Sequence, residues 1–143
     1  MHIPIYAYKN ASKAAYKSDM DLRSITLQMA DGPDVWNEGY TDSIGIQYED
    51  IGCYACDDGV LELLKHSEIA HRVICGHDHV NNWKIYFEGI HLIYSLNTGA
   101  GCYWYPPLNG GTVLKINKNG VYDVEDVFVD ASHLLQSETV ESE

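Results

Sequence analysis

The sequence predicts an α/β chain of the α+β type, with one or two helices and a mainly mixed or antiparallel sheet. Two observations predict this class. Runs rich in β-branched and aromatic residues recur between residues 83 and 129, and turn signals containing Gly and Asn separate them. A helical pattern of apolar residues is clearest over residues 60–64. A length of 143 residues suits a single domain, so both parts are expected to share one core.

The N-terminal part predicts few regular elements. Residues 3–6 place a proline among apolar neighbours, which predicts the end of a strand that runs into a loop. Residues 11–16 predict a short helix with Asn10 or Ser12 as its N-cap. Residues 29–45 are rich in Asp, Gly, Pro and Asn and predict a long loop, of a kind that is often functional.

The middle of the chain predicts a helix and then a strand. Residues 43–48 alternate weakly and are ambiguous. Asp57 and Asp58 precede the apolar helical pattern, and two carboxylates there suit the positive end of the helix dipole. The pair therefore predicts a helix start and not a catalytic dyad. Residues 70–75 predict a short strand that ends at Gly76.

A first hairpin is predicted over residues 83–96. Its strands, residues 83–87 and 92–96, are rich in β-formers and flank the turn signal Glu88-Gly89-Ile90. Residues 97–111, dense in Gly, Pro and aromatic side chains, predict a loop.

A second hairpin is predicted from an Asn-Gly signal, the strongest short indication of a tight turn. Residues 111–116 and 121–129 flank Lys118-Asn119-Gly120. The chain then becomes polar and acidic, so residues 1–130 are expected to form the folded unit and residues 131–143 a disordered tail.

Composition excludes several classes of function. The formal net charge of −12 argues against nucleic-acid binding and against docking on anionic membranes. No apolar run is long enough to span a bilayer and no signal peptide is visible, so a cytoplasmic protein is expected. A phosphate substrate would need local positive charge, which a bound metal ion can supply.

The stretch C-G-H-D-H-V-N-N after the predicted strand carries two histidines with one residue between them. In an extended segment His77 and His79 would face one way, about 6.6 Å apart, within reach of two metal ions about 3.5–4 Å apart. A solvated loop is the alternative. Gly76 lets the backbone turn, Asp78 is a candidate to orient a ligand, and Asn81 either does the same or makes a turn.

The cysteines predict a weaker alternative. Cys53 and Cys56 have C-x-x-C spacing, but no second pair follows. Buried free thiols in a reducing compartment are favoured over a zinc site that uses all four cysteines, which are Cys53, Cys56, Cys75 and Cys102.

Three stretches in order resemble the calcineurin-like metallophosphoesterases, most closely their purple-acid-phosphatase-like branch. They are H-I-P-I-Y from His2, C-G-H-D-H-V-N-N from Cys75, and N-T-G-A-G-C-Y-W-Y from Asn97, followed by G-G-T-V-L-K-I from Gly110. The resemblance covers about residues 1–116.

The resemblance implies a metal-dependent phosphoesterase that hydrolyses phosphate esters at a dinuclear centre of Fe, Zn or Mn. His2 and His77 would ligate one ion, and His79 would ligate the second. The implied fold is a four-layer αββα sandwich, of which this chain would supply the C-terminal half, mainly the second sheet and its helix.

The family's other ligand motifs, D-x-H, G-D-x-x-D and G-N-H-[D/E], precede the H-x-P segment and do not occur in this sequence. The catalytic residue and the bridging ligand are therefore expected upstream of this chain. We expect weak or partial metal binding and no appreciable hydrolysis by the chain alone. An exposed apolar sheet face would lead to self-association or to pairing with a missing N-terminal half.

Two other functions stay open: a non-catalytic binding or regulatory module derived from the same fold, and a small zinc protein that uses Cys53, Cys56 and a histidine pair. Tyr103 and Trp104, in the glycine-rich loop, are candidates for the mouth of a substrate site, although packing over a sheet is at least as good an interpretation. The remaining histidines are expected to be structural or solvated; they are His66, His71, His91 and His133.

Overall fold

The structure is a computed structural model, and it describes residues 1–15, 43–45, 47–67 and 71–130. Within these ranges the chain is a mixed α/β protein with few helices and two small sheets, which confirms the predicted class at this level. The elements in chain order are α1 (Ala7–Ala15), β1 (Ser43–Ile44), α2 (Val60–Lys65), β2 (Arg72–Cys75), β3 (Lys84–Phe87), β4 (Ile90–Tyr94), the 3-10 helix η2 (Pro106–Leu108), β5 (Gly110–Asn117) and β6 (Gly120–Phe128).

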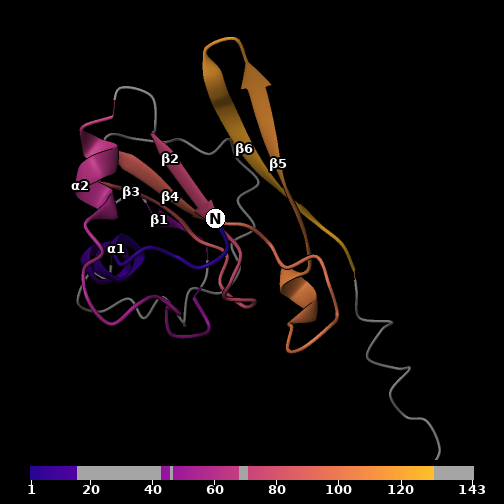
Figure 1. Cartoon of the computed structure of the whole chain (residues 1–143). Coiled ribbons are helices and arrows are strands. Elements are labelled where there is room, and N and C mark those ends of the chain that lie inside the picture. Colours follow the sequence, from indigo (N-terminus) through magenta and orange to yellow (C-terminus); the bar gives the residue numbers. More distant parts are fainter. Residues whose placement is uncertain (16–42, 46, 68–70, 131–143) are drawn as a thin grey trace, which may run out of the picture.

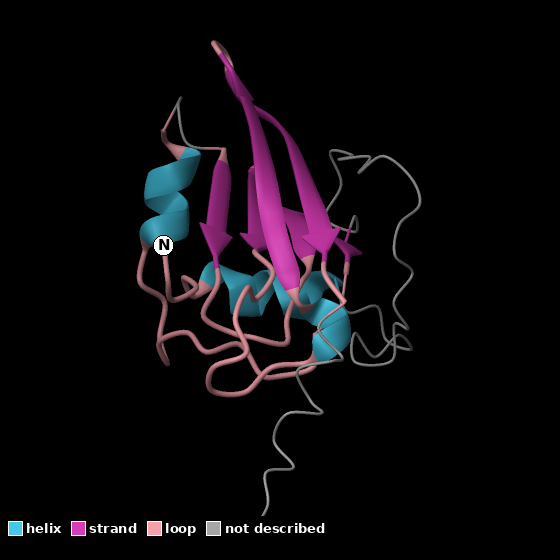
Figure 2. Cartoon of the chain, turned by 90° about the vertical axis from the view of Figure 1, so that its right-hand side faces the viewer, coloured by secondary structure: helices cyan, strands magenta, loops and turns pink. Residues whose placement is uncertain are grey.

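The elements are arranged in layers (Figures 1 and 2). Helices α1 and α2 lie on one side of the four-stranded sheet, and the β5–β6 hairpin lies on its other side. The main core fills the space between the helices and the sheet, where Tyr8, Trp83, Leu92 and Tyr94 are fully buried. On the opposite face, Lys84 of β3 forms an ion pair with Asp126 of β6.

The larger sheet is mixed, with strand order β1-β3-β4-β2. Strands β3 and β4 pair antiparallel and β1 pairs antiparallel with β3, whereas β2 runs parallel to β4. Strand β2 lies at the edge of the sheet. Its C-terminal end leads into a loop at one end of the molecule (Figure 1).

Both predicted hairpins are confirmed. Strands β3 and β4 are joined by a two-residue turn, Glu88-Gly89, and Ile90 is the first residue of β4 instead of part of the turn. Both turn residues have positive φ, 49° for Glu88 and 88° for Gly89, as a type I′ hairpin turn requires. Strands β5 and β6 pair around Lys118-Asn119 with a register shift between Lys115 and Ile116, and Gly120 is the first residue of β6 instead of part of the turn.

The first helix differs from the prediction. Helix α1 begins at Ala7, not at residue 11, and the residues before it do not form a strand. Two observations explain the earlier start: Ala7, Tyr8 and Ala11 are buried against the sheet, and a distant carboxylate, Asp58 Oδ2, accepts a hydrogen bond from the Tyr6 backbone N–H at 2.9 Å. Such a long-range cap leaves no local sequence signal.

The second helix begins as predicted after two aspartates. Asp57 Oδ1 accepts the Gly59 backbone N–H at 2.9 Å, and Asp58 Oδ1 accepts the Val60 backbone N–H at 3.0 Å. These bonds satisfy backbone donors that the first turn of a helix cannot satisfy itself.

Other boundaries shift by a few residues. The ambiguous segment contains the short strand β1, and the predicted loop over residues 97–111 includes η2 and the start of β5. Most of the predicted long loop over residues 29–45, the acidic tail over residues 131–143, and His133 lie outside the described residues.

Candidate metal centre

The N-terminal segment and the loop after β2 lie side by side. The backbone nitrogen of Met1 donates to the Ile74 carbonyl at 2.8 Å, and the Gly76 backbone N–H donates to the His2 carbonyl at 3.4 Å. These two bonds align residues 1–2 with the end of β2. They bring His2 next to the histidine loop, although the two are far apart in the sequence.

His2 and His77 point their ring nitrogens at each other. His2 Nε2 lies 3.1 Å from His77 Nδ1, and the rings meet edge to face with centroids 4.9 Å apart. Two nitrogens that ligate one ion through bonds of about 2.0–2.1 Å lie about 2.9–3.4 Å apart at coordination angles of about 90–110°. The observed separation therefore fits one shared metal ion as well as it fits a single N–H···N hydrogen bond.

His79 points elsewhere. Its Nδ1 lies 2.8 Å from the Tyr103 carbonyl oxygen, and its ring stacks on the Tyr103 ring with centroids 4.6 Å apart and planes at 18°. A carbonyl can only accept, so Nδ1 carries the proton and Nε2 keeps the lone pair that a metal needs. The extended conformation expected for residues 77–79 is wrong, because the chain bends at Asp78 and turns at His79 and Val80.

Asp78 is buried and anchors the loop. Its two carboxylate oxygens each lie 3.2 Å from the Gly52 backbone N–H, and it also accepts a hydrogen bond from the Tyr94 hydroxyl. Burial, together with this hydrogen bond, raises the pKa of Tyr94 far above its usual value, so the hydroxyl stays a neutral donor. Asp78 therefore supports the loop that carries both histidines, and its expected role in orienting a metal ligand stays a prediction.

Gly52 packs directly against this arrangement. A Cβ built on Gly52 would lie 2.7 Å from Asp78 Oδ1 and 2.7 Å from His77 Cδ2. Real Cβ atoms essentially never approach other heavy atoms this closely, so a residue other than glycine would displace the carboxylate or the imidazole. No spacing signal in the sequence indicated Gly52 or Tyr94.

The side chain of Asn81 holds a neighbouring segment and does not simply make a turn. Its Oδ1 accepts the backbone N–H groups of Tyr48 and Glu49 at 3.0 and 3.1 Å, and its Nδ2 donates to the Glu49 carbonyl at 3.2 Å. Asn81 is 1% exposed, so these bonds lie inside the protein. Gly76 is exposed directly after β2, where the sequence placed it.

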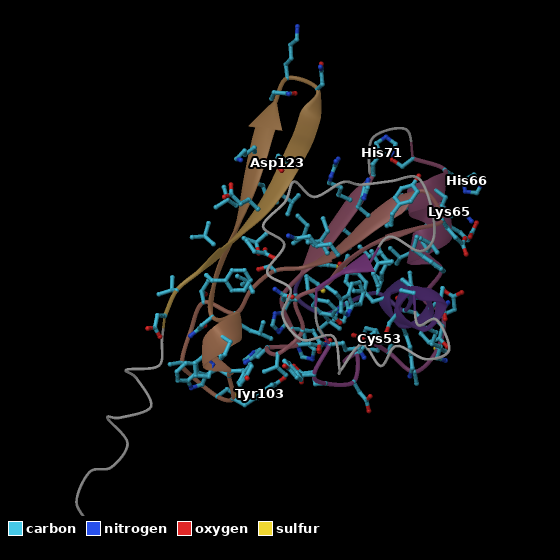
Figure 3. The ribbon with its side chains drawn as sticks, turned by 180° about the vertical axis from the view of Figure 1, so that it is seen from behind. Cys53, Lys65, His66, His71, Tyr103 and Asp123 are labelled. Carbon is cyan, nitrogen blue, oxygen red and sulfur yellow. The ribbon has the colours of Figure 1, made fainter. Side chains whose placement is uncertain are left out.

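The other candidates fall into two groups by position. Tyr103, 47% exposed, lies at the end of the molecule where β2 ends, and Trp104 beside it is half-buried. Figure 3 shows His66 and His71 at the opposite end from Tyr103. His66 Nδ1 donates to the Glu62 carbonyl at 2.6 Å, which is a helix C-terminal contact, and His91 packs on Tyr86 with ring centroids 4.7 Å apart.

The cysteines are free, but only Cys75 is buried, which corrects the expectation of buried thiols throughout. Burial raises the pKa of Cys75 to about 12, so its thiol is inert at neutral pH. Within the part of the chain that the structure describes, no group of three or more His, Cys, Asp or Glu side chains is arranged to hold a metal ion.

No family model, curated protein or solved structure matches this chain. Among the described residues, no helix is both long and apolar enough to cross a membrane.

Proposed function

We propose that this chain is the C-terminal part of a calcineurin-like metallophosphoesterase domain of the purple-acid-phosphatase-like branch, and that the complete domain hydrolyses phosphate esters. One observation carries the proposal. His2 and His77 are 75 positions apart in the sequence, yet their ring nitrogens lie 3.1 Å from each other. The resemblance requires these same two histidines to share one ion.

The donor set suits metal binding. His2 and His77 would hold one ion, and His79, whose proton is held at Nδ1 by the Tyr103 carbonyl, would offer Nε2 to a second. When bound, two such ions supply the positive charge that a phosphoryl group needs at the transition state. A chain with a net charge of −12 would otherwise repel a phosphate ester.

The arrangement of layers also supports the proposal. Helices, a mixed sheet and a second pair of strands follow one another through the molecule, as they would in one half of an αββα sandwich (Figure 1). The remaining ligands, the bridging carboxylate and the catalytic residue would come from a segment that precedes His2. We therefore expect the chain alone to bind metal weakly and to hydrolyse little.

The first test is metal affinity, measured by calorimetric titration of the chain with Zn²⁺. We expect His77→Ala to weaken binding about tenfold or more, because one of two ligands to the same ion is lost. His66→Ala is the matched control, since His66 is exposed at the opposite end of the molecule. Equal affinity of the wild type and His77→Ala would exclude the shared-ion site.

The second measurement uses the natural polypeptide that contains this chain. Hydrolysis of an aryl phosphate with Mn²⁺, Zn²⁺ or Fe is expected, and His79→Ala should abolish it, as should a chelator. Turnover that survives in His79→Ala contradicts the assignment. Metal binding without any turnover would favour a non-catalytic module derived from the same fold.

A further inference from the structure

Glu49 occupies a fixed position beside the histidine loop. Its backbone N–H and carbonyl are both held by the buried Asn81 side chain, and the neighbouring Tyr48 N–H donates to the Val80 carbonyl at 3.3 Å. Glu49 is half-buried, and these hydrogen bonds hold the backbone that carries its carboxylate. Neither its charge nor its place just after the ambiguous segment indicated a role for Glu49 from the sequence.

The two carboxylate oxygens of Glu49 have different partners. Oε1 accepts the Val80 backbone N–H at 3.0 Å, directly after His79 in the chain. Oε2 accepts the hydroxyl of Tyr103 at 2.7 Å. One side chain thus joins the histidine loop to the glycine-rich loop, which is 54 positions away from Glu49. Hydrogen bonds to an ionised acceptor are the stronger kind.

Tyr103 in turn contacts His79 through both its backbone and its ring. The carbonyl accepts the Nδ1 proton of His79, and the phenol ring covers one face of the imidazole. Tyr103 is itself 47% exposed and follows Cys102, whose φ of 62° is unusual for a residue other than glycine. Because about half of Tyr103 is open to solvent, its hydroxyl bond to Glu49 is a contact that can hold the side chain in place.

We propose that Glu49 is a positioning residue for His79, acting through Tyr103: it fixes the Nδ1–H tautomer and the ring plane so that Nε2 faces away as a ligand. The effect on tautomer and orientation does not depend on any metal. The importance of Nε2 as a ligand rests on the function proposed above. Two carboxylates thus divide the support of the loop, Asp78 on the His77 side and Glu49 on the His79 side.

The test is ¹⁵N NMR of the histidine side chains in metal-free protein at pH 8, above the ordinary histidine pKa of about 6.5. The wild type should show His79 with its proton at Nδ1. Tyr103→Phe and Glu49→Ala should both convert this signal to the mixed tautomers of an exposed imidazole. Glu49→Gln keeps one oxygen to accept the Val80 N–H, and its amide NH2 can donate to the Tyr103 hydroxyl, so this variant should keep the wild-type signal. Tyr54→Phe, at a tyrosine that is 67% exposed, is the control and should change nothing.

A change of tautomer can be distinguished from unfolding of the variant. Tyr103→Phe removes one oxygen from a half-exposed side chain, and the backbone amide spectrum reports any wider structural change. A His79 signal that is unaltered in both Tyr103→Phe and Glu49→Ala overturns the proposal. So does a Glu49→Gln variant that behaves like Glu49→Ala.

Zn²⁺ affinity of the same variants separates this inference from the proposed function. Loss of the Nδ1–H tautomer together with binding about tenfold weaker or more supports both. Loss of the tautomer with unchanged affinity supports the positioning role and contradicts His79 as a ligand. Weaker affinity with an unchanged tautomer overturns the positioning role and leaves the metal site standing.

Discussion

Single side chains in this molecule take their roles from the backbone groups they reach, and residue type alone does not predict them. Asp78 and Asn81 both hold the histidine loop against residues 48–52, because each accepts hydrogen bonds from backbone N–H groups of that segment. His91 shows the opposite case. It is a half-buried imidazole on β4, packed on Tyr86, and burial together with the charges of Arg72 and His71 lowers its pKa to about 4.

We therefore expect His91 to make folding sensitive to acid. The unfolded chain takes up a proton on this imidazole near its ordinary pKa of about 6.5, whereas the folded protein resists until about pH 4. The free energy of unfolding should fall as the pH drops through this window and level off below it. Partial exposure keeps the slope below the limit of about 1.4 kcal/mol per pH unit for one proton.

The measurement is urea unfolding of the wild type and His91→Gln between pH 7 and pH 4. As the pH falls, the free energy of unfolding of the wild type should decrease relative to that of His91→Gln. A difference that stays constant across this range contradicts the lowered pKa.

At the scale of elements, local turn chemistry decides the hairpins, and distant groups decide the first helix. The β3–β4 turn depends on Gly89 at φ 88°, a region that other residues rarely adopt. Helix α1, by contrast, begins where Asp58 can accept the Tyr6 N–H. An element whose end is set by its own residues is predictable, and an element whose end is set by a carboxylate from another loop is not.

We expect Gly89→Ala to destabilise the protein by about 1 kcal/mol or more, because alanine is strained at this φ. Gly101→Ala is the matched control. Gly101 has no positive φ, and no heavy atom lies within 4 Å of a Cβ built there, so its substitution should change stability by less than about 0.5 kcal/mol. Chemical denaturation followed by circular dichroism gives both values. Equal effects at the two glycines would contradict the turn assignment.

At the scale of the whole molecule, one buried ion pair joins the two sheets. Lys84 Nζ lies 3.0 Å from Asp126 Oδ2, and the side chains are only 6% and 10% exposed. Thr112 extends this link, since its hydroxyl donates to Asp126 at 2.8 Å and accepts the Leu96 N–H at 3.0 Å. Beyond this link, β5 and β6 expose Val113, Ile116 and Val127, so self-association or pairing with another part of the polypeptide stays a prediction.

We expect Asp126→Ala to cost roughly 3–5 kcal/mol, because it leaves the Lys84 charge buried without its carboxylate. Asp123→Ala on the same strand is the control. Asp123 pairs with Lys115 at 2.7 Å in a solvent-accessible position, so its loss should cost less than about 1 kcal/mol. Urea unfolding of both variants compares them directly, and similar small losses would show that the buried pair does not hold the hairpin in place.

The local features could be predicted from the residues alone: two hairpins, the helix after Asp57 and Asp58, and a histidine loop after a strand that ends at Gly76. Turn residues, side-chain periodicity and dipole-compatible charges act over a few neighbours, so they can be seen in a single sequence. The spacing of His77 and His79 also predicted a pair of metal ligands, whereas only the resemblance added His2 to this prediction.

The contacts between distant residues, by contrast, follow from the folded arrangement of the whole chain. It set His2 against His77 across 75 positions, placed Gly52 where a methyl group would strike His77, and joined Glu49 to His79 through Tyr103. Each of these contacts depends on loops brought together at one end of the sheet by burial of the core between the helices and β2, β3 and β4. That burial acts over the whole chain, so no local pattern could indicate which polar groups it would bring within hydrogen-bonding distance.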